Sequence, residues 1–299
     1  MRPFTETIHS DFLIHWTGRD IDKKCDPSWN SQSSSNKTDD TTTNQYLERL
    51  RSILKHGLWM TKDETPEEVC VNGQTFLKEP VIARTCFTEL KLSQVRKHAE
   101  KFGRLGIGVK RFYLFDRMGG PMVYIQKCTQ NLFFPPYCDW FTAGEEKNEI
   151  LSFFKHMCSS GPPFTYDLFS ESEWRIVYSK RIMRKLKGRR RDDILRLFVD
   201  PKRTNDQETR RFYASLCGKK PECWKNPESG KKPEYLIPLD GWFSLIVFPS
   251  PQVRIAAAND WETQCLIAKA KRRPPRSGIP DYERQMRPIE MDLDACAHF

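Results

Sequence analysis

A short apolar run that ends in a polar triplet, followed after an interruption by a helical repeat, constrains the fold of this chain most. Residues 10–17 read SDFLIHWT, and residues 47–64 read LERLRSILKHGLWMTKDE. The first run has the length of a buried strand. Apolar residues then recur at helical spacing from Leu47 to Leu54 and stop before Gly57, a residue suited to end a helix. The sequence therefore predicts a strand, a loop and a helix in this order.

Composition predicts one large domain with an insertion and a tail. The chain has 299 residues, and 38% of them are hydrophobic, which is enough for a sizeable core. Residues 26–44 are rich in Ser, Thr and Asn, and we expect a disordered insertion there because they bury too little apolar area to offset their ordering entropy. The expected organisation is a single domain over 1–268 and a basic, proline-rich flexible tail over 269–299.

Short apolar runs alternate with helical segments through the middle of the chain. Residues 81–90 and 105–111 have the pattern of strands. Residues 92–103 have the pattern of a helix that ends at Gly103, and residues 143–158 that of another helix. This succession predicts an α+β fold, a mixed, bent sheet with flanking short helices, in place of a long regular parallel sheet.

The charge of the chain bears on its partners. The formal net charge is +10, and the excess is concentrated in residues 180–191 and 269–276. Such basic clusters attract phosphate backbones, so a nucleic acid is one expected partner. The alternative is that these runs are solvated helix faces.

The absence of a membrane-spanning run, of a signal peptide and of zinc-site cysteine spacing predicts the location and the metal content of the protein. No run approaches the roughly 18 apolar residues of a membrane-spanning helix, and the first residues have no apolar core of a signal peptide. We therefore expect a cytoplasmic protein without a membrane partner. The ten cysteines show no zinc-site spacing, which predicts reduced thiols and no metal.

A family resemblance rests on motifs spread over the first two thirds of the chain. The succession HWT, LRSILKHGL, CFTELKLSQVRKHAEKFGRLGIGV, GGPMVYI and EWR resembles the AbiGi family, the antitoxin side of bacterial abortive-infection systems. The resemblance covers most of residues 10–178 and is most specific between Cys86 and Val109. More distantly, the His-Trp-Thr and Glu-Trp-Arg triplets resemble ADP-ribosyltransferases of the DarT type. The resemblance implies phage defence, an ADP-ribosyltransferase-like fold and NAD as cofactor.

A transferase of this kind needs a carboxylate that holds a ribose hydroxyl and stabilises the positive charge developing on the sugar. Glu173 is the first candidate and Glu171 the second, because residues two apart on a strand share a face. Arg175 shares this face too and is a candidate cofactor contact. The alternative is that Glu173 is a surface carboxylate paired with Arg175.

The resemblance also implies the remaining cofactor contacts. His15 would bond the ribose through a ring nitrogen, and Thr17 would support the nicotinamide through its hydroxyl. For His15 the alternative is a core histidine that bonds a backbone carbonyl. Tyr124 could stack on the nicotinamide ring or belong to the core.

The block from Cys86 to His98 offers a further arrangement. A cysteine followed by a histidine is compatible with a thiol nucleophile, but Cys86 lies in an apolar run, where thiols are usually inert. Glu89 and His98 are expected to form a local polar pair that fixes the turn, or to be part of the rim of the cleft. The glycines of LGIGV run into a strand instead of opening a helix, so they do not form a phosphate cradle.

Two functions from different classes follow. The first is a phage-defence enzyme that binds NAD between the His15 strand and the Glu173 strand and modifies a macromolecule. The second is a non-catalytic AbiGi-type antitoxin or regulator that binds a partner toxin. The insertion after Lys24 and the basic segments after Tyr178 are features of this chain that match no family motif.

Overall fold

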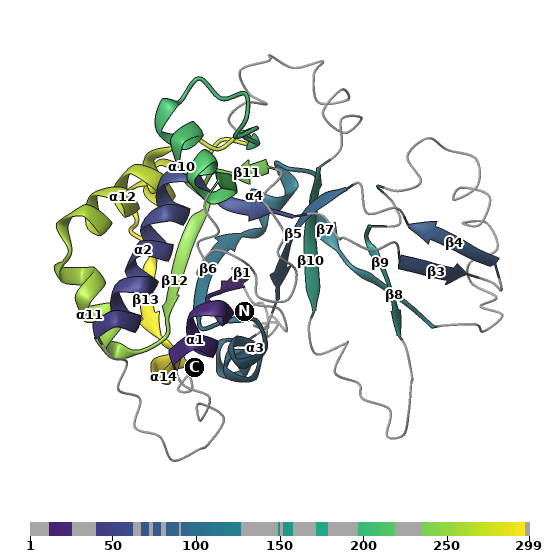
Figure 1. Ribbon diagram of the computed structural model, residues 1–299, viewed down its shortest axis with the longest axis horizontal. Helices are drawn as coiled ribbons and strands as arrows, with labels where there is room; N and C mark the ends of the chain where they lie inside the picture. Colours follow the sequence, from purple (N-terminus) through teal and green to yellow (C-terminus); the bar gives the residue numbers. More distant parts are fainter. Residues whose placement is uncertain are drawn as a thin grey trace, which may run out of the picture. The chain divides into compact units, whose positions relative to one another are not determined.

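The computed structural model contains helices and strands interspersed along the chain, which confirms the α+β class (Figure 1). Its sheet is mixed, because both antiparallel and parallel strand pairs occur. The structure describes residues 12–25, 40–61, 67–71, 74–78, 82–89, 91–126, 149, 152–157, 172–178, 197–218 and 235–296.

The chain divides into two compact units, where we expected a single domain over 1–268. The first unit comprises Met1–Lys55, Phe87–Tyr113 and Leu239–Phe299, and the second comprises His56–Cys86 and Leu114–Pro238. Each unit is thus assembled from segments that are distant in the sequence.

The sheet of the first unit is built around β6 (Leu105–Lys110). One side of β6 pairs antiparallel with β1 (Phe12–Thr17), and the other side pairs antiparallel with β12 (Phe243–Phe248). β12 pairs in parallel with β13 (Ile289–Asp292), and β1 pairs antiparallel with β5 (Ala83–Thr88). The first five residues of β6 and all of β12 are buried, as expected for strands covered on both faces. The strands predicted at 10–17, 81–90 and 105–111 are confirmed.

Two glycines allow the neighbours of β6 to approach closely. A Cβ at Gly108 would lie 2.6 Å from the Cβ of Leu245, and a Cβ at Gly106 would lie 2.9 Å from Cζ3 of Trp16. Real Cβ atoms do not approach other atoms this closely, so larger residues would push the strands apart. The glycines of LGIGV therefore serve packing.

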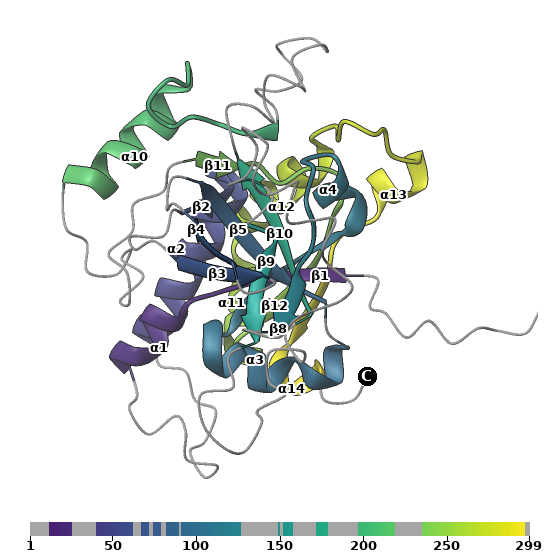
Figure 2. The same ribbon diagram turned by 90° about the vertical axis from the view of Figure 1, so that its right-hand side faces the viewer.

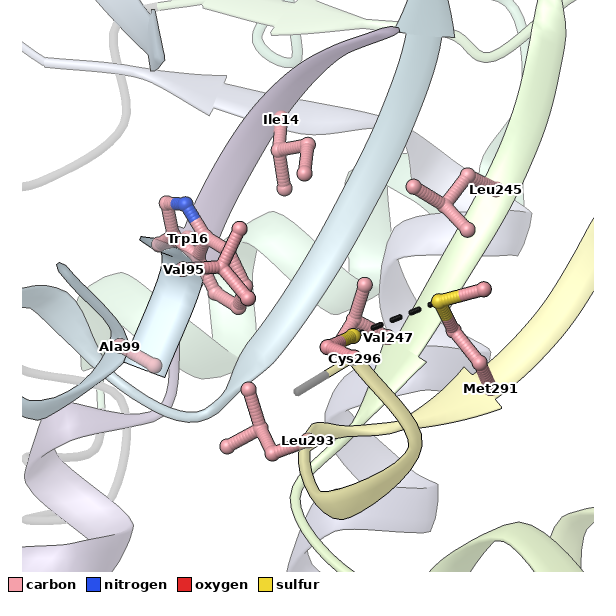
Figure 3. Packing of buried hydrophobic residues seen from close by; sticks show 9 residues of the cluster. All are labelled: Ile14, Trp16, Val95, Ala99, Leu245, Val247, Met291, Leu293 and Cys296. Carbon is pink, nitrogen blue, oxygen red and sulfur yellow. Dashed lines mark hydrogen bonds between the residues drawn. The ribbon is translucent and has the colours of Figure 1, made fainter. Parts of the chain in front are cut away.

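A hydrophobic cluster joins this sheet to two helices. α3 (Val95–Phe102) and α14 (Leu293–Cys296) lie side by side in both views (Figures 1 and 2). With β1, β12 and β13 they enclose Ile14, Trp16, Val95, Ala99, Leu245, Val247, Met291, Leu293 and Cys296, whose side chains lie close to one another in Figure 3. Full burial of a Leu, Ile or Val side chain contributes about 1.5–3 kcal/mol, so this cluster is a main source of stability for the unit.

Three further helices stand beside β12 and β13 in Figure 1: α2 (Asp40–His56), α11 (Pro251–Asn259) and α12 (Trp261–Arg272). Asp260 separates α11 from α12 and caps α12 by accepting a hydrogen bond from the backbone N–H of Thr263 (2.8 Å). The same carboxylate binds Arg51 on α2 at 2.8 Å, which connects α2 to the other two helices.

The C-terminal segment is ordered as far as Cys296, which corrects the predicted flexible tail over 269–299. α12 extends to Arg272, α13 (Asp281–Gln285) follows, and β13 and α14 complete the first unit. Proline and charged residues dominate the composition of this segment, and its few buried apolar residues are too sparse to form a recognisable strand or helix pattern. The four-residue strand β13 is stable because it pairs with β12, and local composition does not reveal such a distant partner.

The predicted disordered insertion over 26–44 is wrong at its C-terminal end. Residues 40–44 form the first turns of α2, and α1 (Arg19–Cys25) precedes them, while residues 26–39 lie outside the described part of the chain. An acidic residue, Asp40, stands in the first turn of α2, where it complements the helix dipole. At the other end, Gly57 has φ +105° and ends α2 as predicted.

Among its described residues, the second unit contains pairs of short strands and the helix α10 (Gln207–Gly218). The antiparallel pairs are β2 (Leu58–Met60) with β11 (Tyr235–Ile237), β3 (Glu67–Val71) with β4 (Gln74–Lys78), and β7 (Gly120–Pro121) with β10 (Glu173–Tyr178). β8 (Val123–Gln126) pairs in parallel with β9 (Phe154–Met157). β9 corrects the end of the helix predicted over 143–158, because pairing with β8 overrides the local helical pattern there. Residues 143–148, 150, 151 and 158 lie outside the described residues.

The remaining helical pieces are short. A 3₁₀ turn, Leu92–Gln94, leads into α3, and α4 (Arg111–Phe115) follows β6. The helix predicted over 92–103 is confirmed from Val95 onward, and it ends at Gly103, which has φ +113°.

Candidate functional site

Glu173, the first residue of β10, forms a buried ion pair. Its Oε1 accepts a hydrogen bond from Nε of Arg175 at 2.7 Å. Arg175 also donates from Nη1 to the backbone carbonyl of Ser152 at 2.7 Å. The exposed fractions are 9% for Glu173 and 5% for Arg175. The pairing that we considered for a surface carboxylate thus occurs, but inside the protein, where charge-assisted bonds are strong and desolvation is costly.

The backbone around Glu173 is held on both sides. Its N–H donates to the hydroxyl oxygen of Tyr124 at 3.3 Å, and its carbonyl accepts from the N–H of Met122 at 2.8 Å. Ser172, immediately before it, has φ +37°, in the left-handed region that non-glycine residues seldom adopt. Strained conformations of this kind cluster at functional sites. The hydrogen bond from the Glu173 N–H to the Tyr124 hydroxyl thus brings two of the predicted site residues together.

Cys86 adds a thiol to this cluster. Burial is the main cause that raises its pKa to about 11, and the charge of Glu173 and a hydrogen bond to Glu173 act in the same direction. A thiol with such a pKa carries little thiolate at neutral pH, so it is a poor nucleophile. This agrees with the interpretation of Cys86 as an inert thiol.

His15 and Thr17 lie on β1 in the first unit. The ring of His15 is half-buried, and its centroid lies 5.8 Å from that of Phe87, at a tilt of 58°. Oγ1 of Thr17 accepts a hydrogen bond from Nη1 of Arg49 at 2.9 Å, and Arg49 also pairs with Asp20 at 2.7 Å. The hydroxyl of Thr17 therefore takes part in a polar network that continues into α1 and α2.

The structure groups the predicted site residues by unit. Glu173, Arg175 and Tyr124 form one cluster in the second unit, whereas His15 and Thr17 belong to the first. Glu171 lies outside the described residues.

A second buried charge cluster follows the HWT triplet and was missed by sequence reasoning. Oδ1 of Asp22 accepts from Nη2 of Arg104 at 2.7 Å and from the hydroxyl of Tyr46. Burial raises the pKa of Asp22 even though Arg104 acts to lower it, and burial also raises the pKa of Tyr46. Gly18 permits this packing: it has φ +101°, and a Cβ there would lie 2.6 Å from the ring of Tyr46. The glycine that directly follows HWT was the available signal.

The polar residues of the Cys86–His98 block have separate partners. Arg111 donates to Glu89, and a hydrogen bond of 2.6 Å joins Oγ1 of Thr88 to Nε2 of His98. The ring of His98 also packs against Phe102, with centroids 4.6 Å apart. Glu89 and His98 therefore each stabilise the local structure near the ends of β5, α3 and β6.

The basic segment 269–276, one of the two expected nucleic-acid contacts, is in part structural. Nζ of Lys271 donates to the carbonyls of Gly241 (2.6 Å) and Phe243 (3.1 Å), and burial lowers the pKa of this lysine. Arg273 donates to the carbonyls of Leu239 (3.4 Å) and Lys55 (3.2 Å). These two cations hold backbone carbonyls, while Lys269 and Arg272 remain exposed. The other basic segment, 180–191, lies outside the described residues.

The described residues form neither a metal site nor a membrane-spanning helix. Within the described ranges, no group of three or more His, Cys, Asp or Glu side chains could hold a metal ion. None of the helices described here is both long enough and apolar enough to cross a membrane.

Comparison with known proteins found no match among family models, curated proteins or solved structures.

Proposed function

We propose that this chain is a cytoplasmic phage-defence protein with an ADP-ribosyltransferase-like fold that transfers ADP-ribose from NAD to a macromolecule. The observation that carries the proposal is the setting of Glu173. Its carboxylate is buried at the head of β10, oriented by Arg175 at 2.7 Å, and preceded by a left-handed Ser172. A fixed carboxylate in a low-dielectric environment is suited to stabilise positive charge that develops during a reaction.

In this proposal Glu173 accepts a hydrogen bond from a ribose hydroxyl and stabilises the cationic character of the sugar. NAD supplies the nicotinamide leaving group and the ADP-ribose. The family resemblance also implies cofactor contacts from His15 and Thr17, but these residues belong to the first unit, so the proposal rests on Glu173 in the second unit. The donor set fits NAD only in part. Arg175 was expected to contact the cofactor, but its guanidinium already binds Glu173 and the carbonyl of Ser152. We therefore assign Arg175 the role of positioning Glu173.

The test is incubation of the purified protein with labelled NAD and bacterial extract. We expect transfer of label by the wild type and a loss of roughly 10²- to 10³-fold in Glu173→Gln, the size seen when one electrostatic contact to a transition state is removed. Glu100→Gln makes the same chemical change on an exposed face of α3 and should leave transfer intact. Absence of transfer by the wild type, or full transfer by Glu173→Gln, would refute the mechanism.

A second candidate function is a non-catalytic AbiGi-type antitoxin that binds a partner toxin. The observation that favours it is the depth of the Glu173–Arg175 pair, since a buried pair that also holds the Ser152 carbonyl resembles a structural one. In this case Glu173→Gln, if folded, should still neutralise a toxin encoded beside this protein in a growth assay. Loss of neutralisation in that variant, with the fold retained, would count against the antitoxin.

A further inference from the structure

The exposed face of α10 carries a row of four residues at helical spacing. Gln207, Arg210, Arg211 and Ala214 follow the i, i+3, i+4, i+7 pattern, and all four are exposed. They line a hollow of about 330 Å³. We call these four residues the α10 face. It contains two guanidinium groups and no carboxylate.

The two arginines of the α10 face are available for a ligand. Among the described residues, no carboxylate lies within ion-pairing distance of Arg210 or Arg211. Two acidic residues lie close to them in the sequence. Asp206 accepts from the hydroxyl of Thr209 at 2.5 Å and from the N–H of Glu208 at 3.1 Å. Glu208 is exposed in the first turn of α10.

The opposite face of α10 is fixed to the second unit, so the arginines project from a rigid support. Phe212 stacks on His56, with ring centroids 4.2 Å apart and planes at 8°. Nδ1 of His56 lies 3.0 Å from Oγ1 of Thr209, which is itself 5% exposed. Because the hydroxyl of Thr209 donates to Asp206, Nδ1 of His56 acts as the donor in this bond. A preorganised helix loses less entropy on binding than a free chain does.

Further positive charge precedes α10. Lys202 and Arg203 are exposed in the turn before the helix, and Nζ of Lys202 lies 6.0 Å from the ring of the half-buried Tyr213. Arg203 has one weak, exposed contact with Asp200 at 3.8 Å. The turn and the helix together present four cations, an aromatic ring and three carboxylates, which are those of Asp200, Asp206 and Glu208. Cations beside an aromatic ring are the groups that proteins use to follow a nucleic-acid strand.

We propose that the α10 face, with Lys202 and Arg203 beside it, binds the phosphodiester backbone of a nucleic acid. The two guanidinium groups of the face, for which no described carboxylate lies within ion-pairing distance, favour a polyanion, because guanidinium groups bind phosphate oxygens through paired N–H donors. This binding does not depend on the transferase proposal, because it needs neither Glu173 nor NAD.

The experiment measures binding of a short fluorescent oligonucleotide, single- or double-stranded, to the full chain without NAD, as salt is raised from about 50 to 200 mM. The test variant is Arg210→Ala with Arg211→Ala. The control is Lys269→Ala with Arg272→Ala, which removes the same charge from exposed positions on α12. Thermal unfolding of both variants checks that they remain folded.

For a single strand, each lost phosphate contact lowers the slope of log affinity against log salt by about 0.7, so the test variant should lose about 1.4 and the control nothing. Equal losses in both variants would mean that net charge alone attracts the strand, and this would overturn the proposal. So would the absence of binding by the wild type. Competition by polyglutamate as effective as that of unlabelled oligonucleotide at equal charge would indicate an acidic protein as the partner and would also overturn it.

Discussion

Each compact unit contains a buried carboxylate–guanidinium pair, and the two pairs hold different things together. In the first unit Asp22 binds Arg104 and Tyr46, which lie 82 and 24 residues away in the sequence, so the pair ties α1 to α2 and to the residue before β6. In the second unit Glu173 binds Arg175, two residues along the same strand. Burying charge costs several kcal/mol per ion. Cross-linking of distant segments accounts for that cost at Asp22. At Glu173 the link to a distant segment is the single bond from Arg175 to the carbonyl of Ser152, and the proposed catalytic role would account for the rest.

The largest effect should come from removing the guanidinium at the Asp22 cluster. Arg104→Ala leaves a buried carboxylate without its cation, and we expect a loss of about 3–5 kcal/mol in the free energy of unfolding, measured with urea at neutral pH. Arg51→Ala is the control, because it removes a partly exposed arginine bound to Asp260 and should cost only about 0–1 kcal/mol.

The pH dependence of this loss has a definite sign. Without Arg104 the folded-state pKa of Asp22, already raised by burial, rises further above the ordinary value of 3.8. The folded state then holds the Asp22 proton more tightly than the unfolded state does. The destabilisation should therefore be largest at neutral pH and shrink as the pH falls toward 3.8. A loss independent of pH would show that packing around Tyr46, and not charge, holds the cluster together.

An intermediate effect on stability should come from Glu173→Gln, and a double variant separates folding from function. The single change leaves the buried Arg175 without its anion and should cost about 1–3 kcal/mol. Replacing Glu173 and Arg175 together by Met removes both charges, and we expect stability near that of the wild type, since apolar replacement of a whole buried pair is often neutral. Transfer of ADP-ribose should fall by roughly 10²- to 10³-fold in both, because both lack the Glu173 carboxylate. Strong destabilisation of the double variant would mean that the pair is structural, as at Asp22.

The smallest effect concerns the Cys86 thiol. Its alkylation rate, followed by mass spectrometry of the Cys86 peptide, should rise with pH toward a midpoint of about 11. In Glu173→Gln the midpoint should move down, because the carboxylate charge and its hydrogen bond both raise the pKa of the thiol. Burial, the largest cause, remains in the variant. An unchanged midpoint would place the Glu173 carboxylate farther from the thiol than the structure does.

The parts of the molecule that sequence patterns predicted are those defined by local chemistry. β1 and β6 were recognisable as apolar runs, and Gly57 and Gly103 end helices where expected because their positive φ angles favour glycine. The α2 helix was recognisable from its apolar repeat, although it begins earlier than predicted.

The missed parts depend on partners far away in the sequence. β13 contains four residues and is stable through its parallel pairing with β12. Lys271 lies in a basic run that suggested a surface, yet it binds the carbonyls of Gly241 and Phe243. At the candidate site, the pairing of Glu173 with Arg175 followed from strand alternation, but its burial did not, because burial depends on which segments cover the strand.

The interleaving of the two units bears on how the protein is made. The second unit is synthesised completely once Pro238 has been added to the chain. β6 pairs with β12 only after Phe243–Phe248 has been synthesised, and β13 is made some forty residues later. During synthesis the first unit must therefore wait with an open sheet edge. A messenger RNA with a premature stop codon between Pro238 and β12 would yield a chain in which one edge of β6 is unpaired. Unpaired strand edges promote aggregation. Cellular quality control should consequently remove short products of this gene even when most of the polypeptide has been translated.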